Sequence, residues 1–245
     1  MTGVQTCALP ISNGDFYRIN GVPESKLFKG LHFVDNARLE KASRELASEC
    51  GALRAKWKIP AAATCFCYVG KLEPKKRILD VLAAMHMALQ HSDASIYLLV
   101  VGSGALMDEA VTFAEQHSLP VTFAGFLNQT EIPAAYVASD CLVLASDYGE
   151  TWGLVVNEAM ACGRAAIVSD RAGCAADLVV EGKTGLTFPF GDVEALADRF
   201  VQAATNPTGL EEMGARARDR VSEHYSIHNA VQGTLSAVRS LALTS

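Results

Sequence analysis

Two glutamates, Glu150 and Glu158, carry the side chains best suited to chemistry in this sequence. They flank a predicted junction between a strand and a helix, because the apolar run 141–144 is followed by turn-forming residues and a helical pattern begins at Gly153. At 1.5 Å of rise per helical residue, their backbones lie roughly 12 Å apart. A retaining hydrolytic pair needs about 5 Å between its carboxyl groups, so the spacing disfavours one. A long ligand with a ribose at one end, a hexose at the other and a diphosphate between them matches the separation.

The backbone between the two glutamates adds hydrogen-bond donors. A helix that starts near Gly153 leaves the amides of Thr151, Trp152 and Gly153 without intrahelical partners, and such a start attracts anions and polar oxygens. The bulky Trp152 is equally suited to anchoring the core. For the glutamates themselves, the alternative is a solvated carboxylate at each end of a helix, but the residues around them favour a ligand site.

A basic cluster forms the second candidate site. Lys71, Lys75, Lys76 and Arg77 follow Gly70 and are the only tight group of cations in the sequence. A lysine-rich turn is usually solvated surface. A single cluster of this size nevertheless suits one small anion such as a diphosphate.

These two segments together resemble retaining glycosyltransferases of family 4, whose fold is called GT-B. Residues 150–163 are similar to the family's Glu-x7-Glu motif, and residues 69–77 are similar to the loop that holds the donor diphosphate. Lys71 stands where many members have Arg, which keeps the positive charge but replaces a bidentate fork with a point charge. Arg77 stands where many members have Gly.

The resemblance extends from about residue 14 to about residue 240. It continues in order through segments 34–36, 101–104, 123–126, 168–170, 181–185 and 190–192. Segment 172–174 departs from the family, whose members often have two consecutive glycines followed by a Glu, and Asp177 stands nearest to that Glu.

The resemblance implies a role for each matching residue. Lys71 and Lys76 would neutralise the leaving diphosphate without a metal, and Glu150 would bind the sugar hydroxyls, so these three are the catalytic candidates. Glu158 would bind the ribose hydroxyls, and residues 126–127 would lie near the base. The donor-binding candidates are Gly70, Gly102, Phe126, Leu127, Thr151, Trp152, Gly153, Leu154 and Glu158.

The domain organisation that the resemblance implies is that of a truncated enzyme. Residues 1–11 resemble the translation of a sequencing-library adapter and are expected to be a non-native tail. Residues 12–58 would be a remnant of the N-terminal acceptor domain with a linker, residues 59–224 the donor-binding domain, and residues 225–245 a C-terminal crossover helix. Most acceptor contacts would then be missing, and we expect the fragment to be inactive without that domain.

Composition excludes several classes of protein. A net charge of -6 argues against nucleic acid as a partner, because nonspecific binding needs a clustered basic surface. No apolar stretch approaches the roughly 18 residues of a membrane-spanning helix, so we expect a cytoplasmic protein with at most peripheral membrane contact. The seven cysteines and six histidines lack the spacing of a disulfide framework or a zinc site, which predicts no metal and no cofactor.

Apolar runs alternate with helical patterns along the chain, which predicts an α/β fold with a doubly wound parallel sheet, one half of a GT-B architecture. Strands are expected at 64–69, 95–101, 121–123, 141–144, 165–169 and 185–188. Helices are expected at 78–91, 105–117, 132–139, 153–162, 175–180 and 193–204, and the tail after residue 206 is expected to be helical, with an apolar pattern over 226–243. Lys71, Gly102, Gly125 and Glu150 all follow predicted strand ends, where ligands bind in such sheets.

The predicted function is transfer of a hexosyl unit, with retention, from a nucleoside diphosphate sugar to an acceptor hydroxyl of unknown identity. Two alternatives remain: a non-catalytic module that binds a nucleotide sugar, and another GT-B enzyme such as a nucleotide-sugar epimerase. Two other motifs are disfavoured. The segment 182–184 lacks the first glycine of a phosphate-binding loop, and Met107 replaces the third glycine of a dinucleotide fingerprint.

Overall fold

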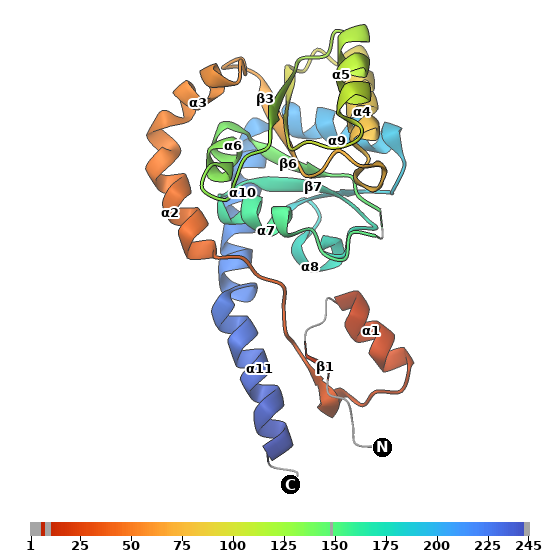
Figure 1. Ribbon diagram of the computed structural model, residues 1–245, viewed down its shortest axis with the longest axis vertical. Coiled ribbons are helices and arrows are strands. Elements are labelled where there is room, and N and C mark those ends of the chain that lie inside the picture. The colour runs from red at the N-terminus through yellow and green to blue at the C-terminus, as the bar shows by residue number, and fades with distance from the viewer. Residues whose placement is uncertain (1–5, 8–10, 148, 243–245) are drawn as a thin grey trace.

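The computed structural model describes residues 6–7, 11–147 and 149–242, and its centre is a parallel sheet (Figure 1). Six strands lie in the order β5-β4-β3-β6-β7-β8. Their bounds are β3 (Thr64–Val69), β4 (Ile96–Val101), β5 (Val121–Gly125), β6 (Cys141–Leu144), β7 (Ala165–Ser169) and β8 (Gly185–Phe188). The chain reverses its direction of winding between β3 and β6, which opens a crevice at the C-terminal strand ends. The predicted doubly wound α/β sheet is therefore confirmed.

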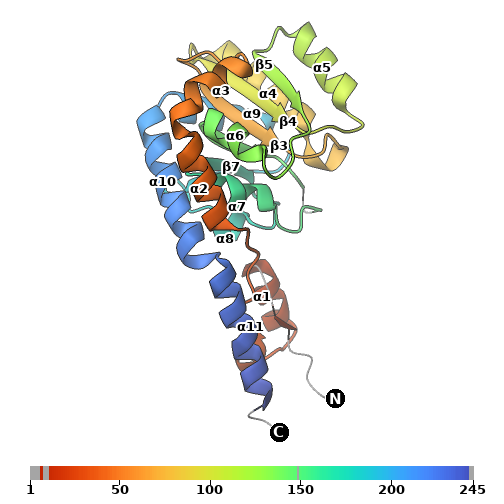
Figure 2. The same cartoon turned by 60° about the vertical axis from the view of Figure 1, so that its left-hand side comes forward.

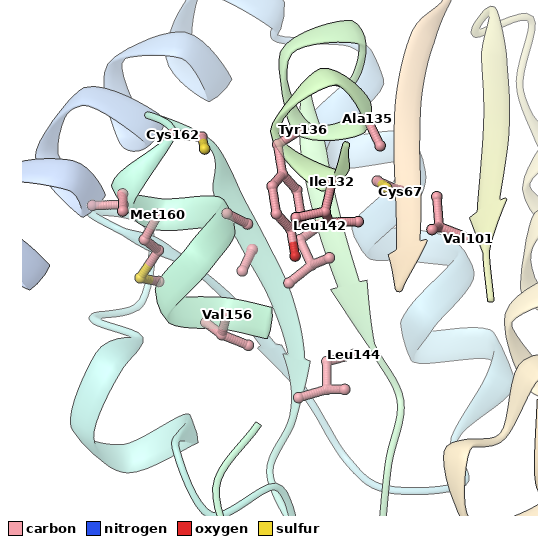
Figure 3. Packing of buried hydrophobic residues seen from close by; sticks show 14 of the residues in the cluster. Cys67, Val101, Ile132, Ala135, Tyr136, Leu142, Leu144, Val156, Met160 and Cys162 are labelled. Atoms are coloured by element: carbon pink, nitrogen blue, oxygen red, sulfur yellow. The ribbon is translucent and has the colours of Figure 1, made fainter. Parts of the chain in front are cut away.

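Helices cover both faces of the sheet, and side chains along the strands alternate accordingly. Cys65 and Cys67 of β3 pack into one buried cluster, whereas Phe66 and Tyr68 pack into the other. The first cluster contains residues of α6 (Ile132–Ala138) and α7 (Leu154–Ala161), and Figure 3 shows part of it. The second contains residues of α4 (Ile78–His91), α5 (Met107–Gln116) and α9 (Val193–Ala204), which lie on the opposite face (Figure 2).

Several predicted helices are shorter than expected, and tertiary contacts explain the differences at α5 and α8. Helix α5 begins two residues late because Gly104 is pressed against the backbone of Leu72, where an added Cβ would lie 2.5 Å from the Leu72 carbonyl oxygen. Helix α8 (Ala175–Leu178) stops early because Val179 is extended and the Val180 amide donates to the Thr184 hydroxyl at 2.8 Å.

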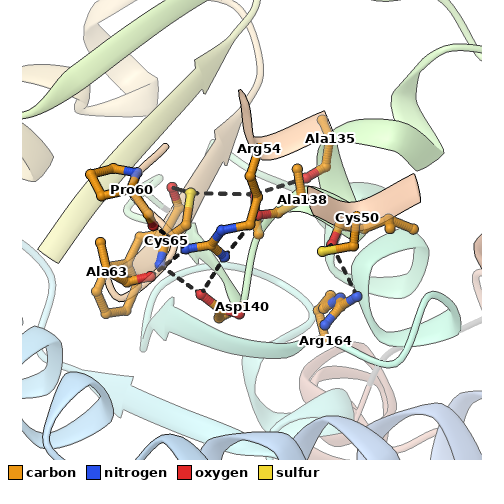
Figure 4. Close-up of polar contacts among 12 residues, drawn as sticks. Cys50, Arg54, Pro60, Ala63, Cys65, Ala135, Ala138, Asp140 and Arg164 are labelled. Carbon is orange, nitrogen blue, oxygen red and sulfur yellow. Dashed lines mark hydrogen bonds and ion pairs between the residues drawn. The ribbon is translucent and has the colours of Figure 1, made fainter. Parts of the chain in front are cut away.

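A second layer of helices joins the sheet to the preceding chain. Helices α2 (Asn36–Leu46) and α3 (Cys50–Lys56) run along the face that α6 covers (Figure 1). Arg54 of α3 fixes this layer: its guanidinium donates to the Ala138 carbonyl at 3.2 Å, to the Asp140 carboxylate at 3.2 Å and to the Pro60 carbonyl at 2.9 Å (Figure 4). The side chain is only 12% exposed, so these bonds form largely away from solvent.

The first and last elements that the structure describes lie together, away from the sheet (Figure 1). Strand β1 (Thr6–Cys7) pairs with β2 (Leu27–Phe28), and α1 (Ile11–Ile19) lies between them in sequence. Helix α10 (Pro207–His224) leads into α11 (Ile227–Ala242), which contacts both short strands. One face of α11 packs through Ala230 and Ala237, while four of the apolar side chains that the structure describes on this helix remain exposed: Ile227, Val231, Leu235 and Val238. Within the described ranges, no helix is both long enough and apolar enough to cross a membrane.

Candidate functional site

The loops after β3 and β4 meet at two glycines. The Gly70 amide donates to the Val101 carbonyl at 3.0 Å, and the Gly102 amide donates to the Gly125 carbonyl at 2.8 Å. Gly102 has a φ of 135°, and a Cβ atom there would lie 1.9 Å from the Gly70 carbonyl oxygen. Only glycine fits both this conformation and this approach.

A pocket of about 530 Å³ opens beside these glycines. It is lined by five of the residues that the sequence singles out: Gly70, Lys71, Gly102, Phe126 and Leu127. Phe126 is 75% exposed, so its ring adds a large apolar surface to an opening whose lining is mostly apolar. The Lys71 side chain is 78% exposed, and its Nζ lies 3.8 Å from Glu73 Oε1. The loops after β3, β4 and β5 thus bring together the exposed Phe126 ring, the exposed Lys71 ammonium and the closely packed backbone of the two glycines.

Lys76 and Glu150 form an ion pair next to this pocket. Lys76 ends the 3-10 helix η3 (Pro74–Lys76), and its ammonium donates to Glu150 Oε2. The two side chains are 18% and 16% exposed. The aliphatic stem of Lys76 lies 4.0 Å from the point where a Cβ of Gly70 would be, so the pair borders the glycine loop. An ammonium has three donors, and Glu150 uses one of them, which leaves donors for an anion.

Arg77 has an unusual backbone for a residue with a side chain. Its φ of 56° lies in the left-handed region, where the resemblance predicts glycine. The guanidinium bonds Asp80 at 2.8 Å and lies 5.5 Å from the centroid of the Phe190 ring. These contacts offset part of the backbone strain and tie the basic loop to the loop after β8.

The segment after Glu150 places its aromatic side chain in the core. The Trp152 ring is 3% exposed, donates through Nε1 to Asn157 Oδ1 at 2.6 Å and packs on His32. Gly153, with a φ of 104°, caps α7, which begins at Leu154. Only the backbone of Trp152 is therefore left for a ligand, while Thr151 and Leu154 are exposed.

Segment 172–174, which departs from the family pattern, supports the loop that contains Glu150 through backbone hydrogen bonds. The Gly173 amide donates to the Glu150 carbonyl at 3.0 Å, and the Cys174 amide donates to the Trp152 carbonyl at 2.9 Å. A Cβ at Gly173 would lie 2.1 Å from the Thr151 carbonyl oxygen. Glycine at 173 is therefore required by packing against the Glu150 loop.

Glu158 lies apart from the pocket lining, on α7. Its Oε2 accepts a hydrogen bond from the Tyr136 hydroxyl at 2.8 Å. Burial raises the pKa of the Glu158 carboxyl above its usual value, against the opposing effects of the Tyr136 hydrogen bond and the charge of Arg38. The structure thus joins Lys76 to Glu150 and gathers five residues at the pocket, but places Glu158 in a separate polar contact.

The sequence gives no sign of two supporting residues. Tyr136 lies in an otherwise apolar helical run, and nothing in the sequence links it to Glu158. The hydroxyl of Tyr68 donates to the Lys71 carbonyl at 3.0 Å and so supports the basic loop from the sheet. Alternation along the strand could have placed Tyr68 on a face, but not at this carbonyl. Among the described residues, no group of three potential ligands could hold a metal ion.

Comparisons with known proteins agree with this geometry. Residues 51–220 match the profile of a family described as "Glycosyl transferases group 1". Glycogen synthase of Mycobacterium tuberculosis (strain CDC 1551 / Oshkosh) is 30% identical over 169 residues, which cover 68% of this chain and 40% of that protein. D-inositol 3-phosphate glycosyltransferase of Rhodococcus erythropolis is 29% identical over 248 residues, which cover 95% of this chain and 55% of that protein. The chain thus spans about half the length of these relatives.

Solved structures share the fold. Anabaena HepE, crystallised in complex with UDP, matches with a TM-score of 0.76 at 19% identity, over 96% of this chain and 63% of that one. At this identity the likeness concerns the fold alone.

Proposed function

This chain belongs to the glycosyl transferases group 1 family, and we propose that it holds the nucleoside diphosphate sugar from which the whole enzyme transfers a hexosyl unit, with retention, to an acceptor hydroxyl. The observation that carries the proposal is the Lys76–Glu150 ion pair at the edge of the glycine-walled pocket. A cation and a carboxylate side by side match a donor that carries phosphate next to sugar hydroxyls. We further propose that the protein acts in the cytoplasm.

The diphosphate would be bound by Lys76 and Lys71. Lys76 is held in place by Glu150, whereas Lys71 is exposed and free to move toward a ligand. Negative charge grows on the diphosphate as the bond to the sugar breaks, so fixed positive charge stabilises the transition state more than the bound donor. The amides at the start of α7 would add donors beside the same group.

The sugar and the nucleoside would lie on opposite sides of the diphosphate. Glu150 would accept hydrogen bonds from the sugar hydroxyls, and Glu158 would accept them from the ribose. The base would rest against Phe126 and Leu127, at the apolar end of the pocket. HepE, the structural neighbour crystallised with UDP, supports a nucleotide in this fold. We assign no nucleophile, because the family's transfer is described as a same-face attack.

Calorimetric titration of the chain with UDP, GDP and ADP tests the proposal. We expect saturable binding of one of these nucleotides, with the same affinity when magnesium is added, because the lysines supply the positive charge. A folded protein that binds none of the three would contradict the proposed donor site. Affinity that depends on magnesium would contradict the role of the lysines.

We expect the preference for UDP over 2′-deoxy-UDP to decrease as the pH is lowered. The decrease should occur at a pH above 4.5, the usual pKa of glutamate. Because burial raises the pKa of Glu158, its ionised form predominates above that raised value and is lost as the pH falls through it. The ionised carboxylate accepts a charge-assisted hydrogen bond from the 2′-hydroxyl, which is stronger than a bond to the neutral acid, and 2′-deoxy-UDP lacks this hydroxyl. The two ligands carry the same diphosphate, so its own titration cancels in the ratio of dissociation constants.

The matched control is Glu158→Gln, which has no carboxyl group to titrate at this position. Its ratio should not change with pH. A ratio that is equally flat in the unmodified protein would rule out a ribose contact by the Glu158 carboxylate.

A further inference from the structure

We propose that Tyr136 is a positioning residue that holds the Glu158 carboxylate for the ribose, and that it thereby sets the preference for ribonucleoside over deoxyribonucleoside diphosphates. This inference rests on the proposed function, in which Glu158 binds the ribose. Tyr136 would touch neither the base nor the sugar. It would act only through the hydrogen bond from its hydroxyl to Glu158.

The first support is the placement of the phenol. Tyr136 lies on α6, is 1% exposed and donates to Glu158 Oε2 at 2.8 Å. Figure 3 shows its hydroxyl pointing toward the end of β6 where Leu144 lies. That is the C-terminal edge of the sheet, at which the candidate donor site also lies.

The second support is the rigidity of the ring. Tyr136 belongs to the same buried cluster as Ile132, Cys67 and Leu142, and Figure 3 shows it among them. Close-packed interiors keep a side chain of this size in one rotamer. The hydroxyl is therefore a fixed point, and a carboxylate that accepts from it has a fixed orientation.

The third support is the state of the carboxylate. Tyr136 satisfies Oε2, while no hydrogen bond to Oε1 is formed by the residues that the structure describes. Oε1 is not one of the fully buried side-chain atoms that lack a partner among the described residues, so a ligand hydroxyl can reach it and find a strong acceptor. One carboxylate oxygen is therefore bound by the protein, and the other is available to the ribose.

A competing charge explains why the hydroxyl is needed. The charge of Arg38 on α2 acts on Glu158, and the Arg38 guanidinium is itself bonded to the Gln129 carbonyl at 2.8 Å. Without the phenol hydroxyl, no hydrogen bond from a described residue would hold the carboxylate, and the positive charge of Arg38 would attract it. We expect Glu158 to turn toward Arg38 in that case and to lose its alignment with the ribose.

The test compares the dissociation constants of UDP and 2′-deoxy-UDP in Tyr136→Phe. If another base is preferred, the ribose and deoxyribose diphosphates of that base replace them. We expect the preference for the ribonucleotide to fall about tenfold, with little change in the affinity for the deoxynucleotide, because one charge-assisted hydrogen bond is lost. A purely structural effect would weaken the binding of both ligands by the same factor. The ratio is also insensitive to partial unfolding, since both ligands bind the same folded population.

Tyr97→Phe is the matched control. Tyr97 is also buried, and its hydroxyl bonds Thr122 at 2.8 Å, away from Glu158. We expect this variant to keep the preference. If it loses as much as Tyr136→Phe, the effect comes from loosening the core and the inference is overturned.

Glu158→Gln separates this inference from the proposed function. If Glu158→Gln keeps the preference, the ribose contact itself is wrong and both fail. If Glu158→Gln loses it while Tyr136→Phe keeps it, the ribose contact stands and only the role of Tyr136 is overturned. Should Tyr136→Phe not fold, Glu158→Asp draws the carboxylate back from the hydroxyl by one methylene, and an unchanged preference there would overturn the inference as well.

Discussion

Replacing Lys76 with alanine is expected to weaken UDP binding by about 10- to 150-fold, which corresponds to roughly 1.5–3 kcal/mol for a charge-assisted contact. The loss should be large because Lys76 is held next to the glycine loop by Glu150 and has little freedom to lose on binding. The variant also leaves the Glu150 carboxylate, which is 16% exposed, without its cation. We therefore expect the free energy of unfolding to fall as well, by about 1–3 kcal/mol. Calorimetric titration and denaturant unfolding measure the two effects.

Two further variants separate charge from packing. Lys75→Ala removes the same charge from the neighbouring, exposed side chain and should change UDP affinity only slightly at physiological salt. Lys76→Met keeps most of the aliphatic stem but not the ammonium, and should bind UDP as weakly as Lys76→Ala. Equal losses in Lys75→Ala and Lys76→Ala would mean that net charge, and not a fixed contact, attracts the nucleotide.

The sheet could be predicted because its strands are continuous apolar runs. The bounds of β3 match the prediction, since both faces of this central strand are covered and every side chain on it is apolar, aromatic or small. Helix ends were less predictable. The start of α5 depends on how closely Gly104 approaches Leu72. Helix α8 ends where the Val180 amide donates a hydrogen bond to the Thr184 hydroxyl. Both are contacts between segments that no local pattern encodes.

The pocket residues were predictable for a different reason. Gly70, Gly102 and the 126–127 loop each follow a strand, and parallel strands bring their C-terminal ends to one edge. The side chain of Trp152 left two readings open, and the structure places it in the core. The hydrogen bond between Tyr136 and Glu158 links α6 to α7, and it can be recognised only once the packing of these two helices is known. What each residue binds stays a prediction until ligands are titrated.

Replacing Gly102 with alanine is expected to lower the free energy of unfolding by about 3–5 kcal/mol and to abolish measurable nucleotide binding. Two costs add at this residue. The φ of 135° is strained for any residue with a Cβ, and that Cβ would lie 1.9 Å from the Gly70 carbonyl oxygen and 2.9 Å from its carbon. Because both atoms belong to the backbone, no side chain can turn aside to relieve the overlap. Relief requires the β3 and β4 loops to separate, and these loops are the walls of the pocket.

Gly51→Ala is the matched control for this substitution. Gly51 lies in α3, and apart from its chain neighbours and the nearby backbone of the same helix, no described atom is within 4 Å of the position its Cβ would take. Alanine is the better helix former, so we expect this variant to be as stable as the parent or up to about 1 kcal/mol more stable, with unchanged nucleotide affinity. Denaturant unfolding followed by titration distinguishes the outcomes. If Gly102→Ala were as stable as Gly51→Ala, the two loops would not be in the close contact described. If it were unstable but still bound UDP with full affinity in its folded fraction, the nucleotide would have to bind elsewhere than between these loops.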